Sequence, residues 1–531
     1  MHTARRCSGP IVAVTTALAL LLSGCGGSAI EESAAAGPNA TEEQAPQAGV
    51  PDAAAQVDTG AVPGVVDPGT AAGGTVATQG ADTPAVPGAP AAPGKDKTAG
   101  TKGSAAAPAA APAAAPAAAP AAATGLTGLI QRQVETQAIF GGSAPCKPAA
   151  GTEIRIGNVS TLSGVLGELF APVVPALETF VASQNACGGL NGHRIKFFIE
   201  DDQGDPSVAA SKIQEMVLKT KVLAFVGNIQ PLSIDGATAL LKKLEVPVVG
   251  ADMVATSDAT HPYIFPQGGN VQSTVYGFVN GAANYFKVKN VGNLYCLEVP
   301  RPCEGAARAL RELAPKFGLT VSKQIQVSIT APSYVQECLQ LKNAGAEVVG
   351  MNLDGASQIR IARSCTQVQY FPKVLSYPLS VGNEKQFLQG LKWMGDAYIP
   401  LNHFPWMATD NAAERYWQAS RTKYSPGSEN GSAASLGWAA GALLVAASAG
   451  LSGTNPTSAQ FLDALYSFRG QKFTELGGLA SPRTFERNGI HKLPYCIWKL
   501  ISNDANTGWK SWSPKAECTD VLAPSDPQAA G

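Results

Sequence analysis

Short apolar segments alternate with amphipathic segments from Glu153 onward, and this alternation limits the fold more than any other feature of the chain. Ile154–Val159 has the pattern of a buried strand, and apolar residues then recur at helical spacing between Leu169 and Val181. Strands this uniformly apolar belong to parallel sheets that helices cover on both faces. The further strands are expected at 195–199, 222–227, 246–250, 291–297, 325–327, 348–353 and 374–376. The sequence therefore predicts an α/β fold with parallel sheets.

The same alternation restarts near Gln272, so we expect two α/β lobes and not one large sheet. The later elements are expected at 410–424, 432–450, 457–468 and 495–500. The stretch Ala433–Leu451 is apolar enough to be taken for a membrane span. Because it contains Ser435 and Ser448 and lies between polar segments, we predict a buried helix that covers a sheet.

Residues 1–25 have the features of a bacterial export signal. Two arginines precede the apolar stretch Ile11–Leu22, which is too short to span a bilayer stably. The tetrapeptide at 22–25 resembles the lipobox of bacterial lipoproteins, which implies that Cys25 is lipidated and becomes the mature N-terminus. An ordinary signal peptide with an incidental cysteine is the alternative. We expect a lipoprotein signal peptide and a protein anchored by lipid on the extracytoplasmic face of the cell membrane.

Residues 26–150 are rich in Ala, Pro and Gly and contain almost no large apolar side chain. Three Ala and one Pro repeat through Ala105–Ala123, and each Pro removes a hydrogen-bond donor that a helix needs. Such a segment buries too little apolar surface to offset the entropy of ordering. We expect a disordered spacer between the membrane and the lobes.

The cysteines support export. Two of the ten, Cys7 and Cys25, lie in the signal region, and an even number in the rest of an exported chain indicates disulfides. Eight cysteines allow about 105 connectivities, so counting alone does not determine the pairing. Our hypothesis pairs neighbours along the chain: Cys146–Cys187, Cys296–Cys303, Cys338–Cys365 and Cys496–Cys518.

Charge and motif content argue against several classes of function. The 39 Lys and Arg nearly balance the 40 Asp and Glu, whereas nucleic-acid binding needs clustered basic residues. No nucleophile elbow, zinc-protease helix or phosphate loop occurs, and no Cys or His set has metal-ligand spacing. Ser420–Lys423 matches an SxxK pattern without its partner motifs, and Glu200–Asp202 with Asp205 is typical of a helix cap and loop anchor. We expect no enzyme, no metal, no cofactor and no nucleic-acid partner.

Several segments lie in a characteristic order: Ser163-Gly164, NACGGLNG at 185–192, EDDQGDP at 200–206, then 222–227, 246–249, 263–265 and Tyr495. This order resembles the branched-chain amino-acid (Leu/Ile/Val) binding protein family, the type I solute-binding proteins of bacterial ABC importers. The resemblance covers about residues 152–500. It implies two Rossmann-like lobes joined by three hinge crossings, which we place near Gln272, Pro400 and Glu475. Lobe 1 is then expected at 152–271 and 401–475, lobe 2 at 272–400 and 476–518, and a disordered tail at 519–531.

The resemblance places the ligand in the cleft between the lobes, where loops follow strand ends. In the family, small hydroxyl residues and backbone amides of the second and third loops hold the α-carboxylate of the ligand. Here Asp252, Met253 and Val254 stand where small residues and Thr would be expected, and Asp252 would repel a carboxylate. We therefore expect a small polar ligand, an amino acid or a related solute with hydroxyls or an amine. The candidate contacts are Ser160, Ser163, Gln230, Ser233, Asp252, Thr256, Asn352, Asp354 and Tyr377.

The expected function is capture of this ligand and its delivery to the permease subunits of an ABC importer, by a monomer held at the membrane through its lipid anchor. The alternative is the same fold acting as a ligand sensor without transport. An exported enzyme is the third hypothesis, which the missing motifs disfavour.

Overall fold

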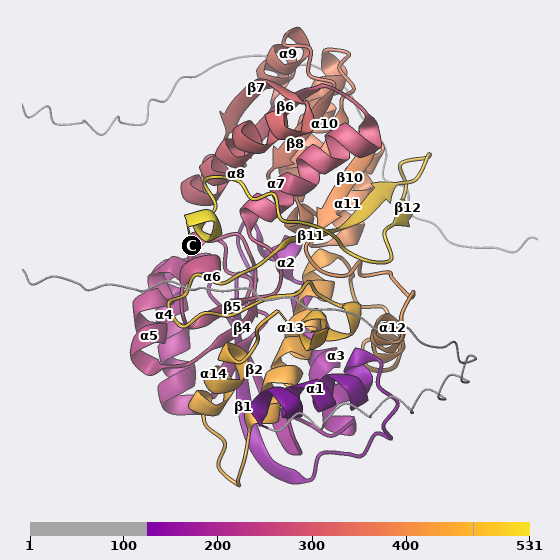
Figure 1. The fold of residues 1–531 in the computed structure, drawn as a ribbon. Helices are drawn as coiled ribbons and strands as arrows, with labels where there is room; N and C mark the ends of the chain where they lie inside the picture. Colours follow the sequence, from indigo (N-terminus) through magenta and orange to yellow (C-terminus); the bar gives the residue numbers. More distant parts are fainter. Residues whose placement is uncertain (1–124, 394, 471, 531) are drawn as a thin grey trace, which may run out of the picture. The chain divides into compact units, whose positions relative to one another are not determined.

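The computed structural model describes residues 125–393, 395–470 and 472–530. The expected signal peptide, its Cys25 and the linker up to residue 124 lie outside these residues. Two β-sheets organise the described part, one in each of two lobes (Figure 1). The predicted α/β fold with two lobes is confirmed.

Lobe 1 contains a five-stranded parallel sheet in the order β2-β1-β3-β4-β5. Its central strands are short and fully buried, as their apolar composition requires. The strands are β1 (Gly151–Ser160), β2 (His193–Asp201), β3 (Ala224–Val226), β4 (Val248–Ala251) and β5 (Ile264–Pro266). The helices are α2 (Gly167–Phe170), α3 (Val173–Ala186), α4 (Pro206–Glu215), α5 (Thr238–Leu244), α6 (Thr256–Thr260), α12 (Ala412–Tyr424), α13 (Ser432–Ala447) and α14 (Ser458–Tyr466).

The acidic segment after β2 is a helix cap and a loop anchor. The Asp205 carboxylate accepts the backbone N–H groups of Ser207 and Val208, and Pro206 opens α4. Asp202 is buried and accepts hydrogen bonds from side chains of neighbouring loops. The interpretation of this cluster as a cap and anchor is confirmed.

Lobe 2 contains a larger sheet in the order β12-β11-β10-β9-β8-β6-β7, with β13 paired to β11. The strands from β10 to β7 are parallel, and β11 joins them antiparallel. The strands are β6 (Asn290–Cys296), β7 (Thr320–Val327), β8 (Val348–Asn352), β9 (Lys373–Ser376), β10 (Ala397–Leu401), β11 (Tyr495–Ser502), β12 (Trp509–Trp512) and β13 (Glu517–Thr519). The helices are α7 (Val271–Asn280), α8 (Pro300–Leu313), α9 (Val335–Asn343), α10 (Gly355–Gln367) and α11 (Glu384–Leu391).

The chain passes between the lobes three times. The first passage connects β5 to α7, and the second follows β10, close to the expected Gln272 and Pro400. Asn402 joins these two passages, because its Nδ2 donates to the Gly269 carbonyl and to the Thr274 hydroxyl. Both passages are therefore held as one hinge.

The third passage differs from the expected position near Glu475. Residues 480–492 stay on lobe 1, where Arg483 donates to the Pro266 carbonyl and His491 contacts the Ile264 carbonyl. The ring of Phe485 lies 5.0 Å from that of Phe265. These aromatic contacts hold residues 480–492 on lobe 1, so the chain returns to lobe 2 only at β11. The segment is irregular, and no helical or strand periodicity in its sequence predicts its position.

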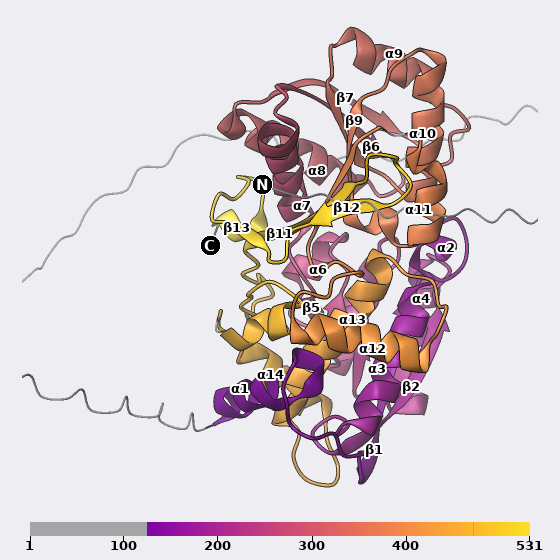
Figure 2. The same cartoon turned by 90° about the vertical axis from the view of Figure 1, so that its right-hand side faces the viewer.

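A helix precedes lobe 1 where the sequence led us to expect disorder up to residue 150. Helix α1 (Leu126–Thr136) packs on lobe 1 beside α13 and α14 (Figure 2). Ile130 is fully buried, and the Gln133 side chain donates to the Ser448 hydroxyl. The apolar residues of α1 recur every four positions, which gives the helix one buried face.

The C-terminal segment is also packed, in contrast to the expected disordered tail. Ala523 and Asp526 are buried, and the Asp526 carboxylate accepts hydrogen bonds from Asn270 and Tyr495. Asn270 is the N-cap of α7, at the first passage between the lobes. The tail is therefore fastened to the hinge by buried polar contacts.

All four predicted disulfides are present. The structure pairs Cys146 with Cys187, Cys296 with Cys303, Cys338 with Cys365, and Cys496 with Cys518. Pairing of neighbours along the chain is therefore confirmed. Disulfides of this number are typical of proteins in an oxidising compartment.

Helix α13 is the apolar stretch that resembles a membrane span. Among the described residues, Ser432–Gly450 is the single helical segment long and apolar enough to cross a membrane. Every residue of α13 is buried, against α3 and β4. The prediction of a buried core helix is confirmed.

Candidate functional site

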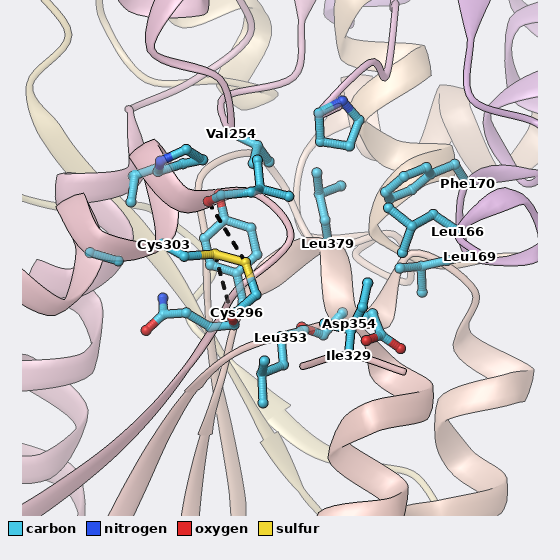
Figure 3. Close-up of a pocket in the computed structure, with 18 residues that line it drawn as sticks. Leu166, Leu169, Phe170, Val254, Cys296, Cys303, Ile329, Leu353, Asp354 and Leu379 are labelled. Atoms are coloured by element: carbon cyan, nitrogen blue, oxygen red, sulfur yellow. Dashed lines mark hydrogen bonds between the residues drawn. A yellow bond between two sulfur atoms is a disulfide. The ribbon is translucent and has the colours of Figure 1, made fainter. Parts of the chain in front are cut away.

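A cavity that is partly open to solvent lies between the lobes at the carboxyl ends of the parallel strands (Figure 3). Lobe 1 and the hinge contribute Leu166, Leu169, Phe170, Pro231, Val254 and Val271. Lobe 2 contributes Cys296, Val299, Pro302, Cys303, Ala306, Ile329, Asn352, Leu353, Asp354, Tyr377, Leu379 and Ser380. Both lobes therefore face one shared space.

The walls of the cavity are mainly apolar. On the lobe 1 side, Leu166, Leu169 and Phe170 form a group around α2 (Figure 3). On the lobe 2 side, the Cys296–Cys303 disulfide joins the end of β6 to the first turn of α8 and forms part of the wall. None of the residues that line the cavity in the described chain is Lys, Arg or His.

Three of the four polar side chains at the cavity already have partners. Asp354 is the N-cap of α10, and its carboxylate accepts from the backbone and the hydroxyl of Ser357. The Ser380 hydroxyl donates to the Leu353 carbonyl and accepts from Gln358. Tyr377 has Thr274 as a side-chain partner, and burial raises the pKa of its hydroxyl, so it stays protonated.

Asn352 differs from these three. It is 6% exposed, and its Oδ1 accepts a hydrogen bond of 3.0 Å from Asn293 Nδ2. Because Asn293 donates this hydrogen bond, the atom of the Asn352 amide that faces Asn293 is the oxygen, and the other is the nitrogen. Its Nδ2 is buried and has no hydrogen-bond partner among the residues that the structure describes. A buried N–H donor without a partner is costly.

The sequence candidates from lobe 2 and those from lobe 1 have different surroundings. Asn352, Asp354 and Tyr377 line the cavity. The six candidates from lobe 1 do not line it, namely Ser160, Ser163, Gln230, Ser233, Asp252 and Thr256. Ser163 and Thr256 are exposed, whereas the other four are buried in contacts within lobe 1.

The buried candidates of lobe 1 form a hydrogen-bond network. Ser160 donates to Asn158, while Gln230 and Ser233 both donate to the Asp202 carboxylate. The Asp252 carboxylate accepts the backbone N–H of Gln230 at 2.8 Å and that of Val254 at 2.9 Å. These polar groups therefore hold the loops after β3 and β4 in shape.

Asp258 lies next to Asp252 and completes this network. Its carboxylate accepts the backbone N–H of Ala255 at 2.9 Å. Burial raises the pKa of both carboxyls, and the Asp252 charge raises that of Asp258 further. Two buried carboxyls in contact favour a state in which one of them keeps its proton.

The two lobes touch along one rim of the cavity. Asn383 Nδ2, just before α11, donates to the Glu168 carbonyl in α2, and the Ser432 hydroxyl donates to the Pro378 carbonyl. The Glu384 N–H donates to the Asn430 carbonyl at 2.7 Å. These contacts bring segments of lobe 2 against lobe 1 beside the cavity.

Comparison with known families decides the identity of the fold. The model of a family described as periplasmic binding protein matches residues 153–496, which is more than half of the chain. The chain belongs to the periplasmic binding protein family. The resemblance found in the sequence is confirmed, and the chain is a ligand-binding protein of the extracytoplasmic type. The family's description is one of binding, not of catalysis.

Solved structures of this family share the fold. A possible leucine/isoleucine/valine-binding protein from Rhodopirellula baltica is 16% identical, with a TM-score of 0.58 over 70% of this chain and 98% of its own. The branched-chain amino-acid transporter substrate-binding protein LivJ of Streptococcus pneumoniae, in complex with isoleucine, is 16% identical, with a TM-score of 0.57 over 69% and 100%. A fatty acid ABC transporter substrate-binding protein from Thermomonospora curvata is 16% identical, with a TM-score of 0.56 over 72% and 97%. The two-lobed type I fold is thereby shown.

One curated relative is similar over a shorter segment. The chemotactic signal transduction system substrate-binding protein BasB of Halobacterium salinarum is 31% identical over 121 residues. The match covers 22% of this chain and 28% of that protein's length.

Most of the apolar residues that line this binding-protein cavity were not among the residues predicted from the sequence. The residues after Ser163-Gly164 form α2, and three of them line the cavity. Val254 and Pro231 lie in two predicted binding loops, in which the polar residues Gln230, Ser233 and Asp252 were the predicted contacts. The apolar side chains in these loops at strand ends could have predicted an apolar cavity wall, although polar contacts were expected there.

Proposed function

We propose that the chain captures a small molecule in the cavity between its lobes and passes it to a membrane partner. The observation that carries this proposal is that one cavity is lined from both lobes, at the ends of both parallel sheets. A ligand there contacts lobe 1 and lobe 2 at once. It therefore stabilises the arrangement in which the lobes are together.

The partner we propose is the permease of an ABC importer. Two structures with the same fold are described as transporter substrate-binding proteins, one for branched-chain amino acids and one for fatty acids. We propose that the protein acts as a monomer on the extracytoplasmic face of the membrane. The four disulfides support that compartment.

A lipid on Cys25 is the proposed anchor. Replacement of the sulfur in Cys25→Ala removes the only atom that the lipid would modify at this motif. The variant is expected to leave the detergent phase and appear in the soluble or uncleaved fraction. An unchanged partition into detergent would show that the anchor lies elsewhere.

Ligand sensing is a second candidate function, favoured by one observation. The similar segment of BasB belongs to a protein described as part of a chemotactic signal transduction system. Uptake of labelled ligand by cells that lack this chain separates the two functions. Loss of uptake supports the importer, whereas normal uptake together with ligand-dependent crosslinking to a receptor supports the sensor.

Capture in the cavity is tested by thermal shift with a panel of amino acids, neutral amides and fatty acids. A ligand that binds the folded state alone stabilises it by about 2.7 kcal/mol at a hundredfold excess over Kd. Val254→Trp fills the cavity and should abolish this shift. The matched control is Val165→Trp, at a residue that is 72% exposed and does not line the cavity.

Two results would contradict cavity binding. One is a ligand that stabilises Val254→Trp as strongly as the wild type. The other is an equal loss of the shift in the Val165→Trp control, since that would mean binding at the surface.

A further inference from the structure

We propose that Asp252 and Asp258 exclude ligands with a carboxylate, and that the cavity takes a neutral molecule with an apolar body and one carbonyl or hydroxyl oxygen. This inference rests on the proposed function and names the ligand class of the same cavity. It replaces the polar solute expected from the sequence, because Asp252 and Gln230 do not line the cavity.

The backbone N–H donors of lobe 1 disfavour a ligand with a carboxylate. Backbone N–H groups in loops after strands are the donors that most readily bind a carboxylate without a cation. Here the N–H groups of Gln230 and Val254 bind the Asp252 carboxylate, and that of Ala255 binds Asp258. The chain's own carboxylates therefore occupy the donors that a ligand carboxylate would need.

Charge at the cavity also disfavours such a ligand. The lining residues include the Asp354 carboxylate and no cationic side chain among the described residues. The Asp252 carboxylate accepts the backbone N–H of Val254, which lines the cavity, and Asp258 is in contact with Asp252. An anionic ligand would meet negative charge and no compensating cation in a poorly solvated space.

The Asn352 side chain supplies a donor to the ligand. Asn352 lines the cavity, and its Nδ2 is buried with no hydrogen-bond partner in the described part of the chain, while Asn293 holds the other end of the amide. It needs an acceptor oxygen from the ligand. A carbonyl or hydroxyl supplies that acceptor without adding charge, and the surrounding Leu, Phe and disulfide wall takes an apolar body.

The inference is tested with three probes that share one branched body: leucine, 4-methylpentanoate and 4-methylpentanamide. Their dissociation constants are measured by ligand-observed NMR. We expect the dissociation constant of the neutral amide to be lower than that of either carboxylate probe by at least about tenfold. Failure of the amide to bind, or equal binding of a carboxylate probe, would overturn the inference.

Asn352→Leu removes the free donor at nearly constant volume. It should weaken binding of the amide by about tenfold. The matched control, Asn343→Leu, changes an exposed asparagine at the end of α9 and should bind as the wild type does. Equal binding by wild type and Asn352→Leu would contradict the role of Asn352.

Asp252→Asn tests the exclusion itself. The variant keeps one acceptor oxygen and releases a backbone donor, so 4-methylpentanoate should gain affinity. If the variant does not fold, Asp258→Ala removes the acceptor of the Ala255 N–H and provides the same comparison there. No gain in either folded variant would overturn the proposed exclusion. If leucine binds the wild type and Val254→Trp abolishes its binding, capture in the cavity stands and only the ligand class fails.

Discussion

Two buried histidines give the stability of this protein a predictable dependence on pH. Burial lowers the pKa of His403 and of His491 from 6.5 to about 4. Within residues 125–530 as described, His403 Nδ1 is buried without a partner, so a second proton there would have no acceptor. His491 Nδ1 accepts the Glu486 N–H, and a proton on it would break that bond. Because the unfolded chain binds these protons first, stability is complete above pH 6.5 and is lost as the pH falls towards 4.

The histidine prediction is tested by urea unfolding of wild type and His403→Gln between pH 7 and pH 4. Each histidine accounts for at most about 3 kcal/mol of this loss. Glutamine retains a donor for the Ser432 carbonyl and does not titrate, so the variant should lose less stability on acidification. Parallel stability curves for the two proteins would contradict the assignment.

The Asp252–Asp258 pair acts in the opposite direction. Since burial raises the pKa of both carboxyls above 3.8, their contribution is complete at low pH and is lost as the pH rises through the folded pKa. Asp258→Asn imitates the protonated form and still accepts the Ala255 N–H. We expect its unfolding free energy to match that of the wild type near pH 4 and to exceed it at pH 8. A variant that is less stable at pH 8 would show that the charged pair is favourable.

At the scale of elements, the rim contact between α2 and the turn before α11 holds the lobes together beside the cavity. A Cβ at Gly382 would lie 2.4 Å from the Leu169 carbonyl oxygen, which is closer than two non-bonded atoms can approach, so the backbone would have to shift. Gly382→Ala should therefore separate the lobes and weaken binding of a cavity ligand by about tenfold, since overpacking typically costs 1–3 kcal/mol.

The control for this prediction is Gly305→Ala in α8, where an added Cβ meets no atom within 4 Å. Dissociation constants and the radius of gyration from solution scattering should change in the first variant alone. Equal affinity and equal compactness in both variants would mean that the rim does not control the arrangement of the lobes.

The sequence predicted most elements because their causes are local. The Asp205-Pro206 start of α4 and the burial of α13 follow from capping chemistry and from uninterrupted apolar composition. The position of the third passage does not, because Phe485 and His491 are held on lobe 1 by contacts with β5, distant in sequence. The hydrogen bonds of Asp252 could not be predicted from the sequence either, since they come from backbone N–H groups of two loops.

At the scale of the whole molecule, three passages of the chain connect two lobes, each built on one sheet, and the cavity lies between these lobes. Helix α1 and the C-terminal tail add to it at places that the family match does not cover. Asp526 in the tail holds the N-cap of α7 and Tyr495 at the start of β11, so the tail ties two of the passages together. The hinge beside the cavity is therefore held together by a C-terminal segment that lies beyond the family match.

A crystal structure with 4-methylpentanamide bound tests the central claim most directly. The account predicts electron density between α2 and the loop after β8, with the amide oxygen at hydrogen-bond distance from Asn352 Nδ2. Both lobes should contact the ligand. Density outside this cavity, or a ligand that contacts one lobe only, would contradict the account.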